Sequence, residues 1–196
     1  MHRPEALDRL RFSLDDPAQF GFSAQTSVST GSSVSARFLN RHVQISEGLF
    51  PELYRTIVRA TQPILGEKTV NAFISADESM NAFCVADSGG PPLIWLSSGL
   101  VKALSSDQLC FVIGHELGHW FFSHSAHPIV EPDGGPRFIA RQQLSRAAEI
   151  SCGRMGLVAC VDLENALMAI LKTASGLDER HIGSRVADFV DQARKI

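Results

Sequence analysis

The sequence predicts an α+β domain in which a small antiparallel or mixed sheet of about three strands packs on one buried helix and several further helices. Three features of the chain support this prediction. Short β-branched and aromatic runs lie between residues 69 and 97, a helical segment that is apolar almost all round follows them, and three more helical patterns close the chain. Strands followed by a run of helices are typical of the α+β class.

The length and composition fit one globular domain. The chain has 196 residues, of which 44% are hydrophobic and 20% are charged, and its net charge is −3. This balance gives no indication of nucleic acid or an anionic membrane surface as a partner. The most apolar window, Leu109 to Phe122, is too short to span a bilayer, so no membrane-spanning segment is expected. The sequence does not indicate an oligomeric state.

The cysteines lack the C-x-x-C spacing of a zinc knuckle or a redox motif. The first residues of the chain lead into a charged segment and lack the apolar stretch of a secretory signal. We therefore expect a cytoplasmic protein whose thiols are buried and reduced. The cysteines are Cys84, Cys110, Cys152 and Cys160.

The chain divides into an N-terminal arm, residues 1–47, and a folded body, residues 48–196. The segment from Ser23 to Ser35 is rich in Ser, Thr and Gly and predicts a flexible loop. An arm of this kind could act as an inhibitory pro-segment. Several aromatic residues are candidates for docking the arm on the body, namely Phe12, Phe20, Phe22 and Phe38.

The first strong helix signal runs from Pro51 to Gln62. Proline suits the first helical turn, and the apolar residues that follow recur at helical spacing on one face. Pro63 should end this helix. Three short strands are then expected, with turn residues 87–92 between the second and the third. These strands are Thr69 to Ser75, Ala82 to Ala86 and Leu93 to Ser97.

A long helix is expected from Ser105 to about His124. Ser105 and Gln108 have capping-box spacing, and the interior of the helix is apolar almost all round, which indicates burial in the domain. Gly176 stands where a later helix should have its C-terminal cap. The segments expected after the long helix are a loop over 125–136 and helices over 138–159, 162–175 and 178–194.

The long helix contains the motif His-Glu-x-x-His. Because residues four apart lie on one helical face, His115 and His119 can hold one zinc ion with their imidazoles. Glu116 points about 100° further around the axis, so it stays off the metal but can reach a water molecule beside it. The motif therefore offers two ligands and a general base for zinc-dependent peptide hydrolysis. His124 lies on a different helical face and is assigned to the helix end or the surface.

A third protein ligand should come from a later helix, and Glu149 is the best candidate. The loop before its helix is long enough to bring that helix back beside the first one. Glu131 lies in a Pro-rich loop, and Glu164 lies at a helix start where the dipole alone explains a carboxylate. An extended metzincin motif is excluded, because Phe122 and Ser125 replace the glycine and histidine that it needs.

Three segments of the chain occur in a characteristic order. They are Asn81-Ala82-Phe83 followed by a strand and Ser98-Gly99-Leu100, then Phe111 to His119, and then Ser145 to Gly156. Together they resemble the gluzincin peptidases of metallopeptidase family forty-eight, typified by the HtpX heat-shock protease and the CAAX prenyl endopeptidases. The resemblance covers roughly residues 65–176. It implies zinc on His115, His119 and Glu149, with Glu116 as the base.

The same resemblance implies a zincin-like fold in residues 48–196, one zinc ion per chain and a polypeptide substrate. The strand near residues 93–97 should form the sheet edge that lines the cleft, where an extended substrate would add a strand. Asn81, Phe83, Trp95 and His181 are expected to bind the substrate. The donor that stabilises the oxyanion stays open. Its candidates are His181, Arg180, His127 and Arg137.

One position departs from the family pattern. The family has Asp four residues after the glutamate ligand, where this chain has Gly153, preceded by Cys152. That Asp accepts a hydrogen bond from a zinc-bound histidine, and loss of such a partner typically lowers metal affinity or activity about 10–100-fold. Ser151 or a backbone carbonyl is a candidate substitute. Cys152 is a candidate fourth ligand, a thiolate that would close the site.

The sequence therefore predicts a zinc endopeptidase that hydrolyses extended or unfolded polypeptides, with Glu116 as general base. The first alternative is a catalytically weak or inactive zinc-binding pseudo-peptidase that acts as an interaction module. Gly153 is the residue that favours this alternative. The second alternative is a helical domain without metal, in which the two histidines are buried with other partners.

Overall fold

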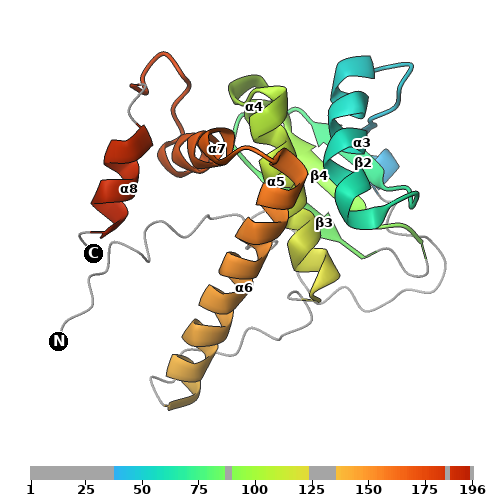
Figure 1. The fold of residues 1–196 in the computed structure, drawn as a ribbon. Coiled ribbons are helices and arrows are strands. Elements are labelled where there is room, and N and C mark those ends of the chain that lie inside the picture. Colours follow the sequence, from blue (N-terminus) through green and yellow to red (C-terminus); the bar gives the residue numbers. More distant parts are fainter. Residues whose placement is uncertain (1–37, 87–89, 124–135, 184–185, 195–196) are drawn as a thin grey trace.

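The computed structural model describes residues 38–86, 90–123, 136–183 and 186–194 of the chain (Figure 1). Within these residues the fold is α+β, as predicted, with a four-stranded mixed sheet packed against several helices. Several expectations fall outside the described residues, or on a side chain that is not described. They concern Phe12, Phe20, Phe22, the segment Ser23 to Ser35, the loop 125–135 with His127 and Glu131, His124, Ser125 and the side chain of Arg137.

The sheet has the strand order β1-β2-β4-β3. The strands are β1 (Val43–Gln44), β2 (Asn71–Ser75), β3 (Ala82–Val85) and β4 (Leu93–Ser97). β2 and β4 run parallel in the middle, and β1 and β3 pair antiparallel to them at the edges. The two-residue strand β1 lies within the segment assigned to the N-terminal arm, and it is too short to show a period in the sequence.

The expectation that residues 93–97 form the sheet edge is wrong. β4 lies between β2 and β3, so the edge on that side is β3. The reason is the apolar content of β4, whose five residues are all buried, as is typical of a strand paired on both sides. β3 instead alternates between buried and half-buried residues. Any chain that adds to this side of the sheet would pair with β3.

The two faces of the sheet belong to two different apolar clusters. Ala72, Cys84 and Ile94 face the main core, which they share with α3, α5 and α7. On the other face, Phe73 packs against Phe38, with their ring centroids 5.5 Å apart. This contact confirms the predicted docking of Phe38 on the body.

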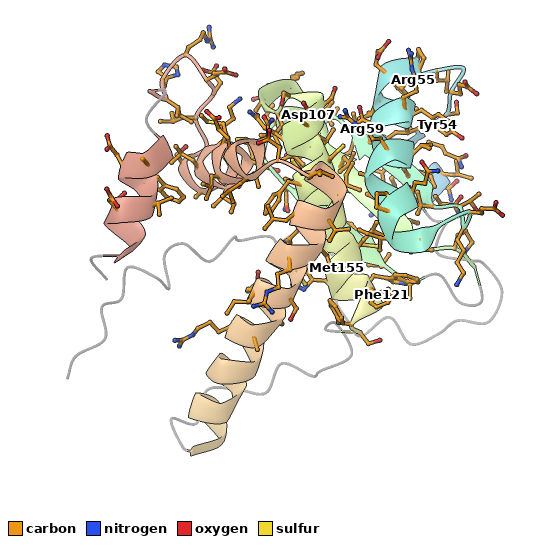
Figure 2. All side chains as sticks on the ribbon, viewed as in Figure 1. Tyr54, Arg55, Arg59, Asp107, Phe121 and Met155 are labelled. Atoms are coloured by element: carbon orange, nitrogen blue, oxygen red, sulfur yellow. The ribbon has the colours of Figure 1, made fainter. Side chains whose placement is uncertain are left out.

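The helix α3 (Pro51–Leu65) continues three residues beyond the expected end at Gln62. The fixed φ of Pro63 is compatible with a helix, and in the last turn its missing N–H removes only one backbone hydrogen bond. The helix ends instead at Gly66, which has a φ of 64° and whose N–H donates to the Gln62 carbonyl. α3 is tied to the start of α5 by an ion pair between Arg59 and Asp107 at 2.8 Å (Figure 2).

The helix α5 (Ser106–Phe121) lies at the centre of the fold, with α3 and α7 on opposite sides of it (Figure 1). The predicted capping box between Ser105 and Gln108 is present. A short helix, α4 (Ser98–Ala103), precedes α5 and was not expected from the sequence. The Ser97 hydroxyl caps α4 by accepting from the Leu100 N–H.

The helices described after α5 are α6 (Pro136–Cys160), α7 (Leu163–Ser175) and α8 (Val186–Arg194). The first two agree with the sequence, and Gly176 caps α7 in the left-handed conformation with a φ of 70°. α8 begins eight residues later than expected, because Asp178 accepts from the Arg180 N–H and holds a turn there. None of the helices described here has the length and apolar character that crossing a membrane requires.

Candidate metal centre

The central helix α5 presents two imidazoles one turn apart. The Nε2 atoms of His115 and His119 lie 3.1 Å from each other, and the rings are tilted by 65°. Both residues are buried, with 6% and 9% of their surface exposed. Polar rings at such depth need a partner, so the two nitrogen atoms mark a polar site inside an otherwise apolar helix.

The helix α6 approaches α5 closely because small residues line the contact. A Cβ added at Gly114 would lie 2.5 Å from the Ala159 Cβ and 3.0 Å from the Gly156 Cα. A Cβ added at Gly118 would lie 3.0 Å from the Cys152 Cα. Since side-chain size sets the distance between packed helices, these glycines allow the two backbones to approach directly. The pair Gly114 and Gly118, four apart in a buried helix, was the sequence signal for this contact and was missed.

The close approach brings Glu149 on α6 to the two histidines. Its carboxylate oxygens lie 3.4 Å from the His115 Nε2 and 3.7 Å from the His119 Nε2. Two atoms that each bind one tetrahedral zinc ion at about 2.0–2.1 Å are about 3.4 Å apart. The His115 Nε2 lies near this distance from both the His119 Nε2 and the Glu149 Oε2, at 3.1 and 3.4 Å, whereas the 3.7 Å contact of His119 is to the other oxygen, Oε1. One ligand atom from each of the three residues lies within 4.8 Å of the others, so the group could hold a single zinc ion. The prediction of Glu149 as the partner of the two histidines is confirmed.

The competing ligands do not join this group. Among the described residues, His115, His119 and Glu149 form the one cluster of His, Cys, Asp or Glu that could hold a metal. Cys152 is outside it, and its sulfur lies 3.1 Å from the position that a Cβ on Gly118 would take. Glu164 is exposed at the start of α7 and is also outside the cluster. The proposal of a site closed by sulfur is therefore wrong.

Glu116 is buried beside the two histidines, with 3% of its surface exposed. Burial, and secondly the charge of the Glu116 carboxylate, raise the pKa of the Cys84 thiol well above its usual value. The Glu116 carboxylate is therefore near enough to the Cys84 thiol on β3 to act on it through its charge.

The two aromatic residues expected to bind substrate do not lie at the metal centre. Phe83 and Trp95 stack on each other, with ring centroids 5.0 Å apart and planes 14° apart. They belong to the cluster around Phe38 and Phe73, on the sheet face away from α5. The strand period of two explains the error, because residues 83 and 95 point opposite to Cys84 and Ile94.

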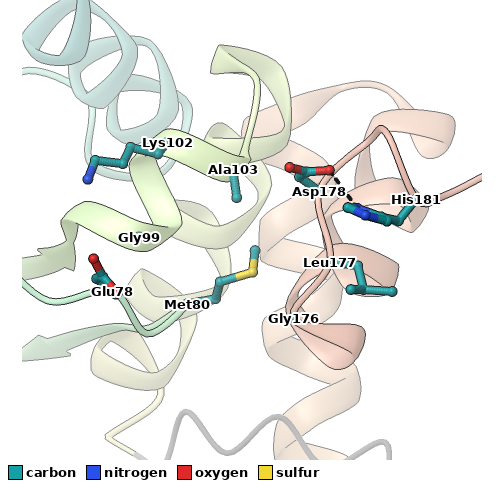
Figure 3. A pocket seen from close by; sticks show the side chains of 9 residues that line it. All are labelled: Glu78, Met80, Gly99, Lys102, Ala103, Gly176, Leu177, Asp178 and His181. Carbon is teal, nitrogen blue, oxygen red and sulfur yellow. Dashed lines mark hydrogen bonds and ion pairs between the residues drawn. The ribbon is translucent and has the colours of Figure 1, made fainter.

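The other two residues expected to bind substrate, Asn81 and His181, lie in two different environments. Asn81 is buried at the start of β3, where its N–H donates to the Ser97 hydroxyl and its carbonyl accepts from the Ser97 N–H. His181 is largely exposed and pairs with Asp178, its Nδ1 lying 3.0 Å from that carboxylate. It lines a cavity that contains none of the three metal ligands (Figure 3).

Gly153 occupies the position at which the family has Asp, and there is room for a side chain at this position. A Cβ added at Gly153 meets no atom within 4 Å. The Ser151 hydroxyl donates to the Ala147 carbonyl at 2.9 Å, which commits it to its own helix. Ser151 is therefore not the substitute for that Asp.

Two histidines one turn apart, a glutamate from a later helix and a mixed sheet alongside define the gluzincin class of zinc metallopeptidases. The comparisons with known proteins agree with the geometry. The chain belongs to peptidase family M48, whose pattern matches residues 50–179. This match covers α3 to the loop after α7 and includes all three metal ligands.

The chain is also similar to a curated relative, the "Plastoglobule-localized metallopeptidase 48, chloroplastic" of Arabidopsis thaliana. The two are 28% identical over 168 residues, which cover 78% of this chain and 48% of the relative. The chain thus spans about half the length of that protein. No solved structure matches the chain significantly.

Proposed function

We propose that this protein is a zinc-dependent endopeptidase that holds one zinc ion per chain and hydrolyses extended or unfolded polypeptides. The observation that supports it most directly is the convergence of His115, His119 and Glu149 at 3.1–3.7 Å, with the Glu116 carboxylate buried beside them. The family and the similar metallopeptidase of Arabidopsis thaliana support the same activity. The cytoplasmic location stays a prediction.

The residues of this chain have distinct roles in the proposed reaction. Bound zinc would polarise the scissile carbonyl and make an attacking water more acidic. Glu116 would take a proton from that water and pass it to the amine that leaves. His115, His119 and Glu149 would fix the position of the ion.

The edge strand β3 supports an extended substrate. Within the part of the chain that the structure describes, its backbone pairs with β4 on one side only, so its other side offers an edge at which a further strand could pair. β3 also packs along α5, the helix that carries His115, Glu116 and His119, so a chain added to β3 would run near this helix. A polypeptide bound by strand addition is recognised through its backbone, which favours unfolded substrates.

The proposal is tested by the Glu116→Gln variant, in which an amide replaces the base without changing its size. The parent should cleave an unfolded polypeptide such as casein, and Glu116→Gln should lose at least about a hundredfold in rate. The zinc content should stay at about one per chain in both proteins, since Glu116 is not a ligand. Equal rates for the parent and Glu116→Gln would contradict the assignment of the base.

The pseudo-peptidase alternative predicts a different pattern in the same experiment. Gly153 in place of the family's Asp is the observation that favours it. The parent would then bind zinc but cleave no polypeptide. Introducing Gly153→Asp, for which the structure offers space, would test whether a carboxylate at this position restores activity.

A further inference from the structure

The helices α5 and α6 run antiparallel, and small residues fix their register at two levels (Figure 1). At the first level, a Cβ added at Gly118 would lie 3.0 Å from the Cys152 Cα. At the second level, a Cβ added at Gly114 would lie 3.0 Å from the Gly156 Cα. A step of four residues back along α5 therefore matches a step of four residues forward along α6.

The next level of this contact holds two cysteines. Cys110 stands four residues before Gly114, and Cys160 stands four residues after Gly156. Cys110 lies in the main core with 1% of its surface exposed, and Cys160 packs against the same core from the end of α6. The register thus places the two cysteines opposite each other, and both thiols are free in this structure.

The distance between the two backbones suits a disulfide. Since a Cβ lies about 1.5 Å from its own Cα, the facing Cα atoms at the two glycine levels are at most about 4.5 Å apart. A disulfide joins Cα atoms that are about 4.4–6.8 Å apart. The helices can therefore diverge by about 2 Å over the next turn and still admit the bond.

The electrostatics of the two thiols also indicate that they are neighbours. Burial raises the pKa of both Cys110 and Cys160, and the charge of Cys160 adds to the rise at Cys110. The Arg59 guanidinium partly opposes the rise of both pKa values, whereas the Asp107 carboxylate adds to it. Arg59 and Asp107 form the ion pair between α3 and α5 (Figure 2). Both thiols therefore lie within reach of the same two charges.

Each thiol is held weakly in its present orientation. Cys110 donates to the Thr56 carbonyl at 3.7 Å, and Cys160 donates to the Asp162 carbonyl at 3.4 Å. Because a thiol is a weak donor, a change of rotamer that turns either sulfur towards the other helix loses little.

We propose that Cys110 and Cys160 form a redox modification site, at which a peroxide oxidises the two thiols to a disulfide between α5 and α6. The half-exposed Cys160 reacts first. Its sulfur attacks one peroxide oxygen, the O–O bond breaks, and the other oxygen leaves with the thiol proton, as water when the peroxide is hydrogen peroxide. The Cys110 sulfur then attacks the sulfenic sulfur of Cys160, and the hydroxyl leaves with the Cys110 proton as water. Two electrons pass from the two thiols to one peroxide.

The bond would join the two helices that form the metal centre. His115 and His119 are on α5 and Glu149 is on α6, so oxidation would hold the three ligands together. The site does not depend on the proposed function, because the chemistry needs neither zinc nor Glu116.

The test is a disulfide map of the zinc-loaded full-length chain after treatment with hydrogen peroxide. Trypsin puts each of the four cysteines on a different peptide, because it cleaves after Lys68, Lys102, Arg137, Arg146, Arg154 and Lys172. Without reduction, the peptides of Cys110 and Cys160 should appear as one linked species, lighter by two hydrogen atoms than the two together. Dithiothreitol should separate them.

Thermal unfolding gives a second readout. Closing the loop from Cys110 to Cys160 should raise the melting temperature of the peroxide-treated protein by roughly 5–10 °C over its reduced form. Cys160→Ser, which changes a half-exposed side chain, should show neither the link nor the rise. The matched control Cys84→Ser should show both.

The inference is overturned if peroxide leaves the two peptides unlinked or links either one to Cys84 or Cys152. It is also overturned if the linked protein melts no higher than the reduced protein, because the bond would then not fit the native contact.

Discussion

Replacing Gly114 by Ala should disturb the metal centre without touching any ligand. A Cβ at this position would lie 2.5 Å from the Ala159 Cβ and 2.9 Å from the Met155 carbonyl oxygen. Carbon atoms in contact normally lie about 3.5–4.0 Å apart, so α5 and α6 must separate by roughly 1 Å. Overpacking of this kind typically costs about 1–3 kcal/mol.

The separation also moves the third ligand. Glu149 is on α6 and the two histidines are on α5, with 3.4 and 3.7 Å between their ligand atoms. Metal sites tolerate changes of only about 0.2 Å in bond length, so we expect zinc affinity to fall at least tenfold in Gly114→Ala. Competition with a chromophoric zinc chelator measures this loss, and thermal unfolding of the zinc-free proteins measures the packing cost.

Gly153→Ala is the matched control, because it makes the same change in α6 where a Cβ meets no atom within 4 Å. Both variants gain about the same helix propensity, roughly 0.5–1 kcal/mol, so their difference isolates the clash. We expect Gly114→Ala to unfold about 2–10 °C below Gly153→Ala. Equal melting temperatures and equal zinc affinities would refute the argument that small residues at this contact position Glu149.

Further predictions concern the surroundings of the site. Lys172→Met should lower the free energy of unfolding by about 1–3 kcal/mol in urea denaturation, because a buried carbonyl loses its donor; a change within error would refute this. Thiol labelling at pH 7.5, followed by mass spectrometry, should modify half-exposed Cys160 before Cys84, whose pKa burial raises well above its usual value. Faster labelling of Cys84 would contradict its placement. Gly99→Ala should destabilise the fold by about 1–3 kcal/mol, because its Cβ would clash with the Glu78 carbonyl oxygen; unchanged urea unfolding would count against this contact.

The parts of the site that lie on one helix were predictable from the sequence. His115, Glu116 and His119 follow from helical spacing, and the capping box at Ser105 set the start of the helix. Glu149 was found because its helix had to return beside α5. These inferences need only local periodicity and one long loop.

The parts that depend on pairing between distant segments were not predictable in the same way. The assignment of β4 as an edge failed because strand order follows from packing, and the apolar run of residues 93–97 was the available sign of an interior strand. Phe83 and Trp95 were expected to bind the substrate, but the strand period of two places them on the sheet face away from α5. The burial of Lys172 was not predicted, because a lysine in an amphipathic helix usually faces solvent.

The central claim is that His115, His119 and Glu149 together hold one zinc ion, and the zinc affinity of Glu149→Ala tests it most directly. Chelator competition should give about one zinc per chain in the parent and an affinity at least tenfold lower in Glu149→Ala, a loss of about 1.4 kcal/mol or more. Glu164→Ala, which removes an exposed carboxylate outside the cluster, should bind zinc like the parent. Zinc bound equally tightly by Glu149→Ala and the parent would contradict the account.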